Sequence, residues 1–112
     1  MKILFVCSAN EKRSRTAEDY FASKYPEIKF SSAGTNHKIC QQKGTTPLEE
    51  NMLKEADVVY VMEKKHKDII EQHVGHTYSS KINVLGIKDD YKYYQKELID
   101  ILELKCIIKN ES

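Results

Sequence analysis

The chain has 112 residues, of which 40% are hydrophobic, and this suits one domain with its own core but is too short for two. Lysine and arginine number 18 against 17 acidic residues, so the formal net charge is only +1. A chain so balanced lacks the overall positive field that attracts nucleic acid or an anionic membrane. We therefore expect a single domain over residues 1–112, with no nucleic-acid partner and no membrane partner.

The apolar run near the N-terminus covers only residues 3–6, which is far shorter than a signal-peptide core or a membrane span. The cysteines Cys7, Cys40 and Cys106 are an odd, widely spaced set without a C-x-x-C pair. Such a set is untypical of a disulfide framework and of a zinc site. We expect a cytoplasmic protein with reduced thiols and with no metal or other cofactor.

Strand-like apolar runs alternate with helix-like segments in the first half of the chain. The pattern predicts a strand at 3–6, a helix over 14–24 and a second strand at 28–31, which a turn at 32–35 ends. Residues 36–46 are polar and have no hydrophobic period, so we predict a loop there.

The alternation continues in the second half. Pro47 suits the first turn of a helix that runs to Glu55, with Thr46 as its N-cap and Glu49 as its capping-box partner. The remaining predicted elements are a buried strand at 58–62, a helix whose apolar stripe comprises residues 66, 69, 70, 73 and 74 and which Gly75 closes, a strand at 82–85, and a helix over 95–108.

Strands that are apolar throughout and are separated by helices indicate a parallel sheet with helices on both faces. The predicted fold is therefore a small doubly wound α/β domain with four parallel strands. Ligands of such sheets bind beyond the carboxyl ends of the strands, where the strand order reverses. Cys7 directly follows the first predicted strand, so we expect it at that edge.

The segment from Cys7 to Arg13 has the features of an anion site. The five residues between them allow the backbone to curl into a loop with inward N–H groups, just before a helix N-terminus that favours negative charge. The same field and Arg13 favour the thiolate form of Cys7 and make it a nucleophile. The planar fork of Arg13 suits two oxygens of a phosphate or sulfate. The segment is thus predicted to bind an oxyanion and to attack it.

Four segments, in order, resemble the low-molecular-weight protein-tyrosine phosphatases. They are the C-x5-R-S pattern at 7–14, SAGT at 32–35, ADVVYVM at 56–62 followed by His66, and DDY at 89–91, which is similar to the family's Asp-Pro-Tyr acid motif. The likeness is greatest to a shorter subgroup with Ile-Pro-Asp-Asp-Tyr before a last helix. A single short pattern recurs by chance, but four in the right order make the resemblance strong.

The resemblance implies a cysteine-dependent phosphatase that hydrolyses phosphotyrosine-like monoesters through a phosphocysteine. Its substrate would be a phosphotyrosine-containing protein or a small aryl phosphate. It makes Cys7 the nucleophile, Arg13 the phosphate clamp and Asp89 the general acid. Asp90 is the reserve candidate for the acid, and Tyr91 would form an aromatic wall for the substrate ring.

The resemblance also assigns a phosphate-binding loop, which comprises Ser8, Ala9, Asn10, Glu11, Lys12 and Ser14. Asn10 would hold the loop in its strained shape, and Ser14 would donate a hydrogen bond to the thiolate. Ala9 replaces a usual glycine, which costs about 1 kcal/mol if its φ is positive. Lys12 replaces a usual second cysteine, which removes a thiol that would trap an oxidised Cys7 as a disulfide.

Two other functions remain open on the sequence. A non-catalytic phosphate-binding module would keep the anion site without turnover. A thiol-dependent arsenate reductase on the same fold would need further cysteines to relay a disulfide, whereas Cys40 and Cys106 stand alone. His66 and His73 are interpreted as packing or hydrogen-bonded histidines rather than metal ligands.

Overall fold

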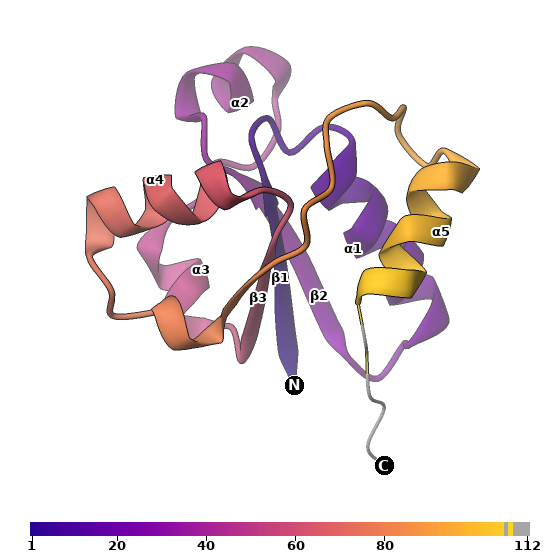
Figure 1. Cartoon of the computed structure of the whole chain (residues 1–112), viewed down its shortest axis with the longest axis horizontal. Helices are drawn as coiled ribbons and strands as arrows, with labels where there is room; N and C mark the ends of the chain where they lie inside the picture. Colours follow the sequence, from indigo (N-terminus) through magenta and orange to yellow (C-terminus); the bar gives the residue numbers. More distant parts are fainter. Residues whose placement is uncertain (107, 109–112) are drawn as a thin grey trace.

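The computed structural model describes residues 1–106 and 108, and Figure 1 shows one parallel sheet surrounded by helices. The strands are β1 (Lys2–Cys7), β2 (Lys29–Gly34), β3 (Val58–Val61) and β4 (Ile82–Val84), in the order β2-β1-β3-β4. The chain adds β2 on one side of β1 and then crosses to add β3 on the other, so the strand order reverses between β1 and β3. The predicted doubly wound sheet of four strands is confirmed.

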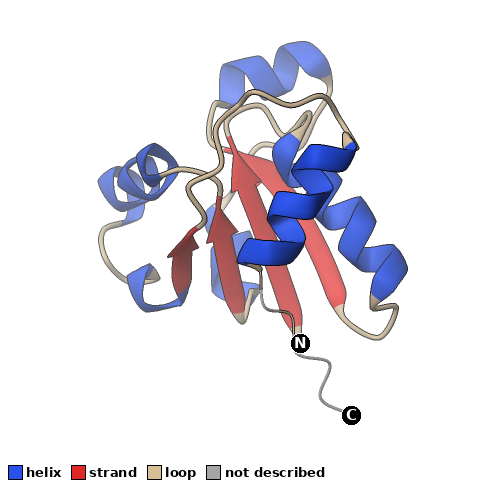
Figure 2. Cartoon of the chain, turned by 45° about the vertical axis from the view of Figure 1, so that its right-hand side comes forward, coloured by secondary structure: helices blue, strands red, loops and turns tan. Residues whose placement is uncertain are grey.

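The helices cover both faces of the sheet, as predicted (Figure 2). On one face lie α1 (Arg13–Lys24) and α5 (Lys96–Lys105), and on the other lie α3 (Glu50–Glu55) and α4 (Lys64–Val74). The short helix α2 (His37–Lys43) lies beyond the carboxyl ends of the strands, and a 3₁₀ turn (Ser79–Lys81) precedes β4. Among the described residues, no helix is long and apolar enough to cross a membrane.

The central strand β1 is buried on both faces. Phe5 packs with Phe21 and Leu98 on the face of α1 and α5, whereas Leu4 and Val6 pack on the face of α3 and α4. A strand covered on both sides has no solvent-facing positions, which explains why its sequence is apolar throughout. The best-packed strand of the sheet thus leads directly to Cys7.

The segment after Ser31 departs from the prediction. The predicted turn at 32–35 is wrong, because β2 continues to Gly34 and pairs there with Cys7. The predicted loop at 36–46 contains α2, which Asn36 caps by accepting from the Ile39 N–H and which ends at Gly44 with φ of 69°. Helix α2 has seven residues and buries only Cys40, so its sequence shows no hydrophobic period. Its two capping residues, Asn36 and Gly44, were the available signals.

Other boundaries shift by smaller amounts. Helix α3 begins at Glu50 and has Glu49, not Thr46, as its N-cap, because Pro47 forms a bridge with Gly34 and continues the sheet edge. Helix α4 ends at Gly75 as predicted, but its His73 side is exposed. Helix α5 ends at Lys105, before the predicted end at 108, and residue 107 lies outside the described part of the chain.

Candidate active site

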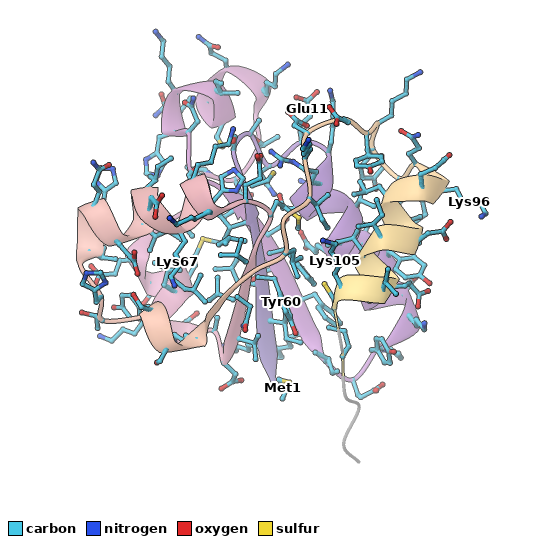
Figure 3. The ribbon with its side chains drawn as sticks, viewed as in Figure 1. Met1, Glu11, Tyr60, Lys67, Lys96 and Lys105 are labelled. Carbon is cyan, nitrogen blue, oxygen red and sulfur yellow. The ribbon has the colours of Figure 1, made fainter. Side chains whose placement is uncertain are left out.

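Cys7 lies at the carboxyl edge of the sheet, at the point where the strand order reverses. Its side chain is 3% exposed, and its carbonyl accepts a hydrogen bond from the Thr35 N–H at 2.9 Å, beyond the end of β2. The residues that follow it curl over this edge, where Figure 3 shows Glu11 at the opposite end of the molecule from Met1. The fold therefore places Cys7 where doubly wound sheets bind ligands.

A chain of hydrogen bonds orients the Ser14 hydroxyl toward Cys7. The Thr46 N–H donates to Asn10 Oδ1 at 3.1 Å, so the Asn10 amide nitrogen faces Ser14 Oγ, to which it donates at 2.8 Å. Because Ser14 Oγ accepts that bond, its own hydrogen is free for Cys7 Sγ, 3.0 Å away. Ser14 lies inside α1 and Lys12 is the N-cap, so Ser14 can stabilise a thiolate rather than cap the helix.

The strained residue of the loop is Asn10, with φ of 54°, and not Ala9. Asparagine tolerates the left-handed region better than other non-glycine residues, because its short amide bonds locally. Asn10 is fully buried and both of its amide atoms have partners, so its surroundings hold it in this conformation. Ala9, which replaces the family's usual glycine, does not have a positive φ and therefore adds no backbone strain.

Arg13 is only 2% exposed and lies beneath the loop. Its Nη1 donates to Glu63 Oε2 at 2.6 Å and to the Ile87 carbonyl at 2.8 Å. These two bonds use both hydrogens of Nη1, so the edge formed by Nε and Nη2 is the one that remains for an oxyanion. Asp89 Oδ1 approaches that edge, at 3.7 Å from Nε.

Glu63 and His66 join the site from the start of α4, where Glu63 is the N-cap and His66 lies in the first turn. Arg13 lowers the pKa of the Glu63 carboxyl through their hydrogen bond. His66 Nε2 lies 2.9 Å from Ser8 Oγ, and His66 Nδ1 accepts from the Glu63 N–H at 3.0 Å. Glu63 was not among the predicted site residues. The available signal was a carboxylate that follows the buried strand predicted at 58–62.

The acid motif lies at the rim of the site. Asp89 and Asp90 are both exposed, and Asp89 lines a pocket of about 50 Å³ together with Cys7, Ala9, Glu11, Lys12 and Arg13. Tyr91 is half-buried and packs against the core cluster that contains Phe5 and Leu98. The structure thus brings Asp89 to the same pocket as Cys7, whereas Tyr91 lies against the core.

Cys40 lies against the phosphate-binding loop. Its sulfur is fully buried, 3.6 Å from the Ala9 carbonyl and 3.9 Å from the Ser8 carbonyl. No local pattern indicated this contact, because the helix that carries Cys40 was not predicted. Cys106 is buried in the core near α5, and burial raises the pKa of its thiol to about 12.

A larger cavity of about 540 Å³ lies between α2, α3 and α4. Its lining includes Thr35, Leu48, Leu53, Ile69 and Val74, with no member of the 7–14 segment among the residues described there. We assign the active site to the smaller pocket, because that pocket contains the thiol, the arginine and a carboxylate together.

The model of the low molecular weight phosphotyrosine protein phosphatase family matches residues 2–103. The chain belongs to this family. It is therefore an enzyme, a cysteine-dependent phosphatase, as the resemblance predicted.

Several known proteins are similar to this chain in sequence or in structure. The low molecular weight protein-tyrosine-phosphatase PtpB of Staphylococcus aureus is 31% identical over an alignment 138 positions long, which covers 96% of this chain and 99% of PtpB. A crystal structure of a YwlE mutant from Bacillus subtilis superimposes with a TM-score of 0.73, at 25% identity and 93% coverage of both chains. The tyrosine phosphatase amsI of Erwinia amylovora gives a TM-score of 0.74 at 26% identity, covering 93% of this chain and 87% of amsI.

Proposed function

We propose that Cys7 is the nucleophile, that Arg13 clamps the phosphate and that the loop Ser8–Lys12 with Ser14 cradles it. The observation that carries this proposal is the directed hydrogen-bond chain from Thr46 through Asn10 and Ser14 to Cys7, because it presents a donor to the sulfur. A thiolate so stabilised attacks phosphorus, and the equatorial oxygens gain the free edge of Arg13 and the loop amides.

Asp89 supplies the proton that the reaction needs. As the bond between phosphorus and the ester oxygen breaks, the protonated Asp89 donates to that oxygen and leaves a phosphocysteine at Cys7. Asp89, now ionised, accepts a proton from water, which attacks phosphorus, releases inorganic phosphate and restores the thiolate. Its place at the rim of the pocket, near Arg13 Nε, supports this role over that of Asp90.

The substrate is a phosphotyrosine residue of a protein or a small aryl phosphate. The family to which the chain belongs supports this substrate class. Tyr91 is proposed as a wall for the substrate ring, because it follows the acid motif directly. We place the enzyme in the cytoplasm, because the thiols of Cys7, Cys40 and Cys106 are free and a thiolate nucleophile needs a reducing compartment.

Hydrolysis of p-nitrophenyl phosphate and of a phosphotyrosine peptide tests the proposal. We expect turnover by the wild-type chain and loss of turnover in Cys7→Ser, with phosphate binding retained, because an alcohol keeps the shape of the loop but is not ionised at neutral pH. Substantial turnover by Cys7→Ser contradicts the covalent mechanism. Phosphate binding without turnover in the wild type shows a non-catalytic phosphate-binding module instead.

A further inference from the structure

The start of α4, the helix that follows β3, contacts both ends of the phosphate-binding loop. Strands β1 and β3 are parallel neighbours, so the segments that leave them lie at the same edge of the sheet. Glu63, the N-cap of α4, reaches Arg13 at the end of the loop, and His66, in the first turn of α4, reaches Ser8 at its start. The start of this helix thus joins the residue after the nucleophile to the phosphate clamp.

The hydrogen bonds of His66 define its tautomer. Its Nδ1 accepts from the Glu63 N–H at 3.0 Å, so a neutral ring carries its proton on Nε2 and donates it to Ser8 Oγ, 2.9 Å away. The ring is fully buried, and burial lowers its pKa to about 4, with the Arg13 charge acting in the same direction. His66 therefore stays neutral at working pH and serves as a fixed donor rather than as a proton relay.

A small rotation of the backbone at Ser8 would disturb the phosphate-binding loop. Its carbonyl accepts from the Asn36 N–H at 3.0 Å, on the side of α2, while its side chain bonds His66 on the side of α4. These two hydrogen bonds hold Ser8, the residue that directly follows Cys7, from two sides. Their loss would let the loop amides turn away from the phosphate.

We propose that His66 is a positioning residue for phosphate binding, acting through the Ser8 hydroxyl to hold the start of the phosphate-binding loop in its anion-binding curvature. This inference rests on the proposed role of the loop around Cys7. His66 does not touch the reacting atoms, and its second bond, to the Glu63 N–H, caps α4. The two bonds belong to different ring nitrogens, so they can be removed separately.

Two substitutions separate these bonds. His66→Gln places an amide nitrogen near the position of Nε2 and keeps a donor for Ser8, whereas His66→Asn places an acceptor near Nδ1 and keeps the cap on Glu63. We expect His66→Gln to stay within about threefold of the wild type in kcat/KM on p-nitrophenyl phosphate, and His66→Asn to lose roughly tenfold to a hundredfold. Thermal stability should follow the opposite order, because the cap survives in His66→Asn.

Ser8→Ala provides an independent route that leaves His66 and the helix cap in place. We expect it to lower kcat/KM by a factor similar to that of His66→Asn and to weaken inhibition by inorganic phosphate. The double variant Ser8→Ala/His66→Asn should be no worse than either single variant, because both remove the same bond. His73→Gln, an exposed histidine on the same helix, is the matched control and should behave as the wild type.

The proposal is overturned if kcat/KM follows thermal stability, so that His66→Asn is as active as His66→Gln or more active. His66 would then act only as a helix cap. Wild-type activity in Ser8→Ala, or additive losses in the double variant, also overturns the proposal. Protection of Cys7 from iodoacetate by inorganic phosphate measures the cradle without turnover. If the wild type binds phosphate but does not hydrolyse esters, the proposed function fails. The role of His66 is still tested, because His66→Asn should then lose the protection of Cys7 by phosphate.

Discussion

Asp89 Oδ1 lies 3.7 Å from Arg13 Nε, at the mouth of the pocket that contains Cys7. An oxyanion on the free edge of Arg13 would therefore meet the Asp89 carboxyl beside its leaving group. We expect Asp89→Asn to lose roughly 10²–10⁴-fold in rate on phenyl phosphate or phosphotyrosine, which have poor leaving groups. An activated aryl ester should lose much less, and rates across a series of leaving groups measure the difference.

Asp90→Asn is the matched control, because Asp90 is the exposed neighbour of Asp89. We expect little change in rate on any ester. Misfolding would depress all substrates alike, so dependence on the leaving group identifies the acid. If only Asp90→Asn shows that dependence, the wrong carboxylate has been assigned, and if neither shows it, the acid lies elsewhere.

Alkylation by iodoacetate should select Cys7 among the three cysteines. Cys7 lines the pocket, whereas Cys40 is fully buried and the pKa of Cys106 is raised to about 12 by burial. A protonated, buried thiol is a poor nucleophile. We expect one carboxymethyl group, located by peptide mass spectrometry on Cys7, and slower modification in inorganic phosphate. Modification that ignores phosphate would show that the loop does not bind the anion.

The stability of the protein should fall as the pH is lowered from about 6.5 toward 4. The pKa of His66 is lowered from 6.5 to about 4 by burial, so in this range the unfolded state takes up a proton that the native state does not. The free energy of unfolding falls by up to about 3 kcal/mol, at about 1.4 kcal/mol for each pKa unit. Urea unfolding at a series of pH values measures this slope.

His66→Gln is the comparison for the pH series, because the glutamine side chain at position 66 does not titrate. We expect a flatter curve for this variant between pH 6.5 and 4. The paired Glu63 carboxylate contributes to both proteins at lower pH, so it cancels in the difference. Parallel curves for the two proteins would show that His66 is protonated in the native state.

Gly34→Ala, a substitution at the end of the neighbouring strand β2, should lower the activity of the site. A Cβ on Gly34 would lie 2.5 Å from the Ser8 carbonyl oxygen and 2.6 Å from Cys40 Sγ, so the loop must move. We expect a loss of roughly a hundredfold in kcat/KM, because displacements of about 1 Å have that effect on positioned groups. The measurement is steady-state kinetics on p-nitrophenyl phosphate, with circular dichroism to establish folding.

Gly44→Ala serves as the control for Gly34→Ala. A Cβ there meets no atom within 4 Å, but φ is +69°. We expect it to cost about 1 kcal/mol of stability through backbone strain and to leave kcat unchanged. Equal kinetic losses in the two variants would mean that the contacts of Gly34 with the loop are unimportant.

The amino-acid pattern alone predicts a doubly wound parallel sheet and places Cys7 at the end of its first strand. Apolar runs such as 3–6 and 58–62 are sufficient for this, because a strand covered on both faces must be apolar at every position. The pairing of Cys7 with Arg13 was also predictable, since both lie in one local segment between a strand and a helix. Local patterns therefore carry this part of the site.

The distant residues that support the segment from Cys7 to Arg13 are known only from the packing of the folded chain. Glu63 and His66 join Arg13 and Ser8 because β3 pairs beside β1, and Cys40 reaches the loop because a short helix forms over the strand edge. Such contacts depend on strand order and on helix placement, which no local period encodes. The anion site is thus local in sequence, but its supports come from chain segments that are brought together only by the packing of the sheet.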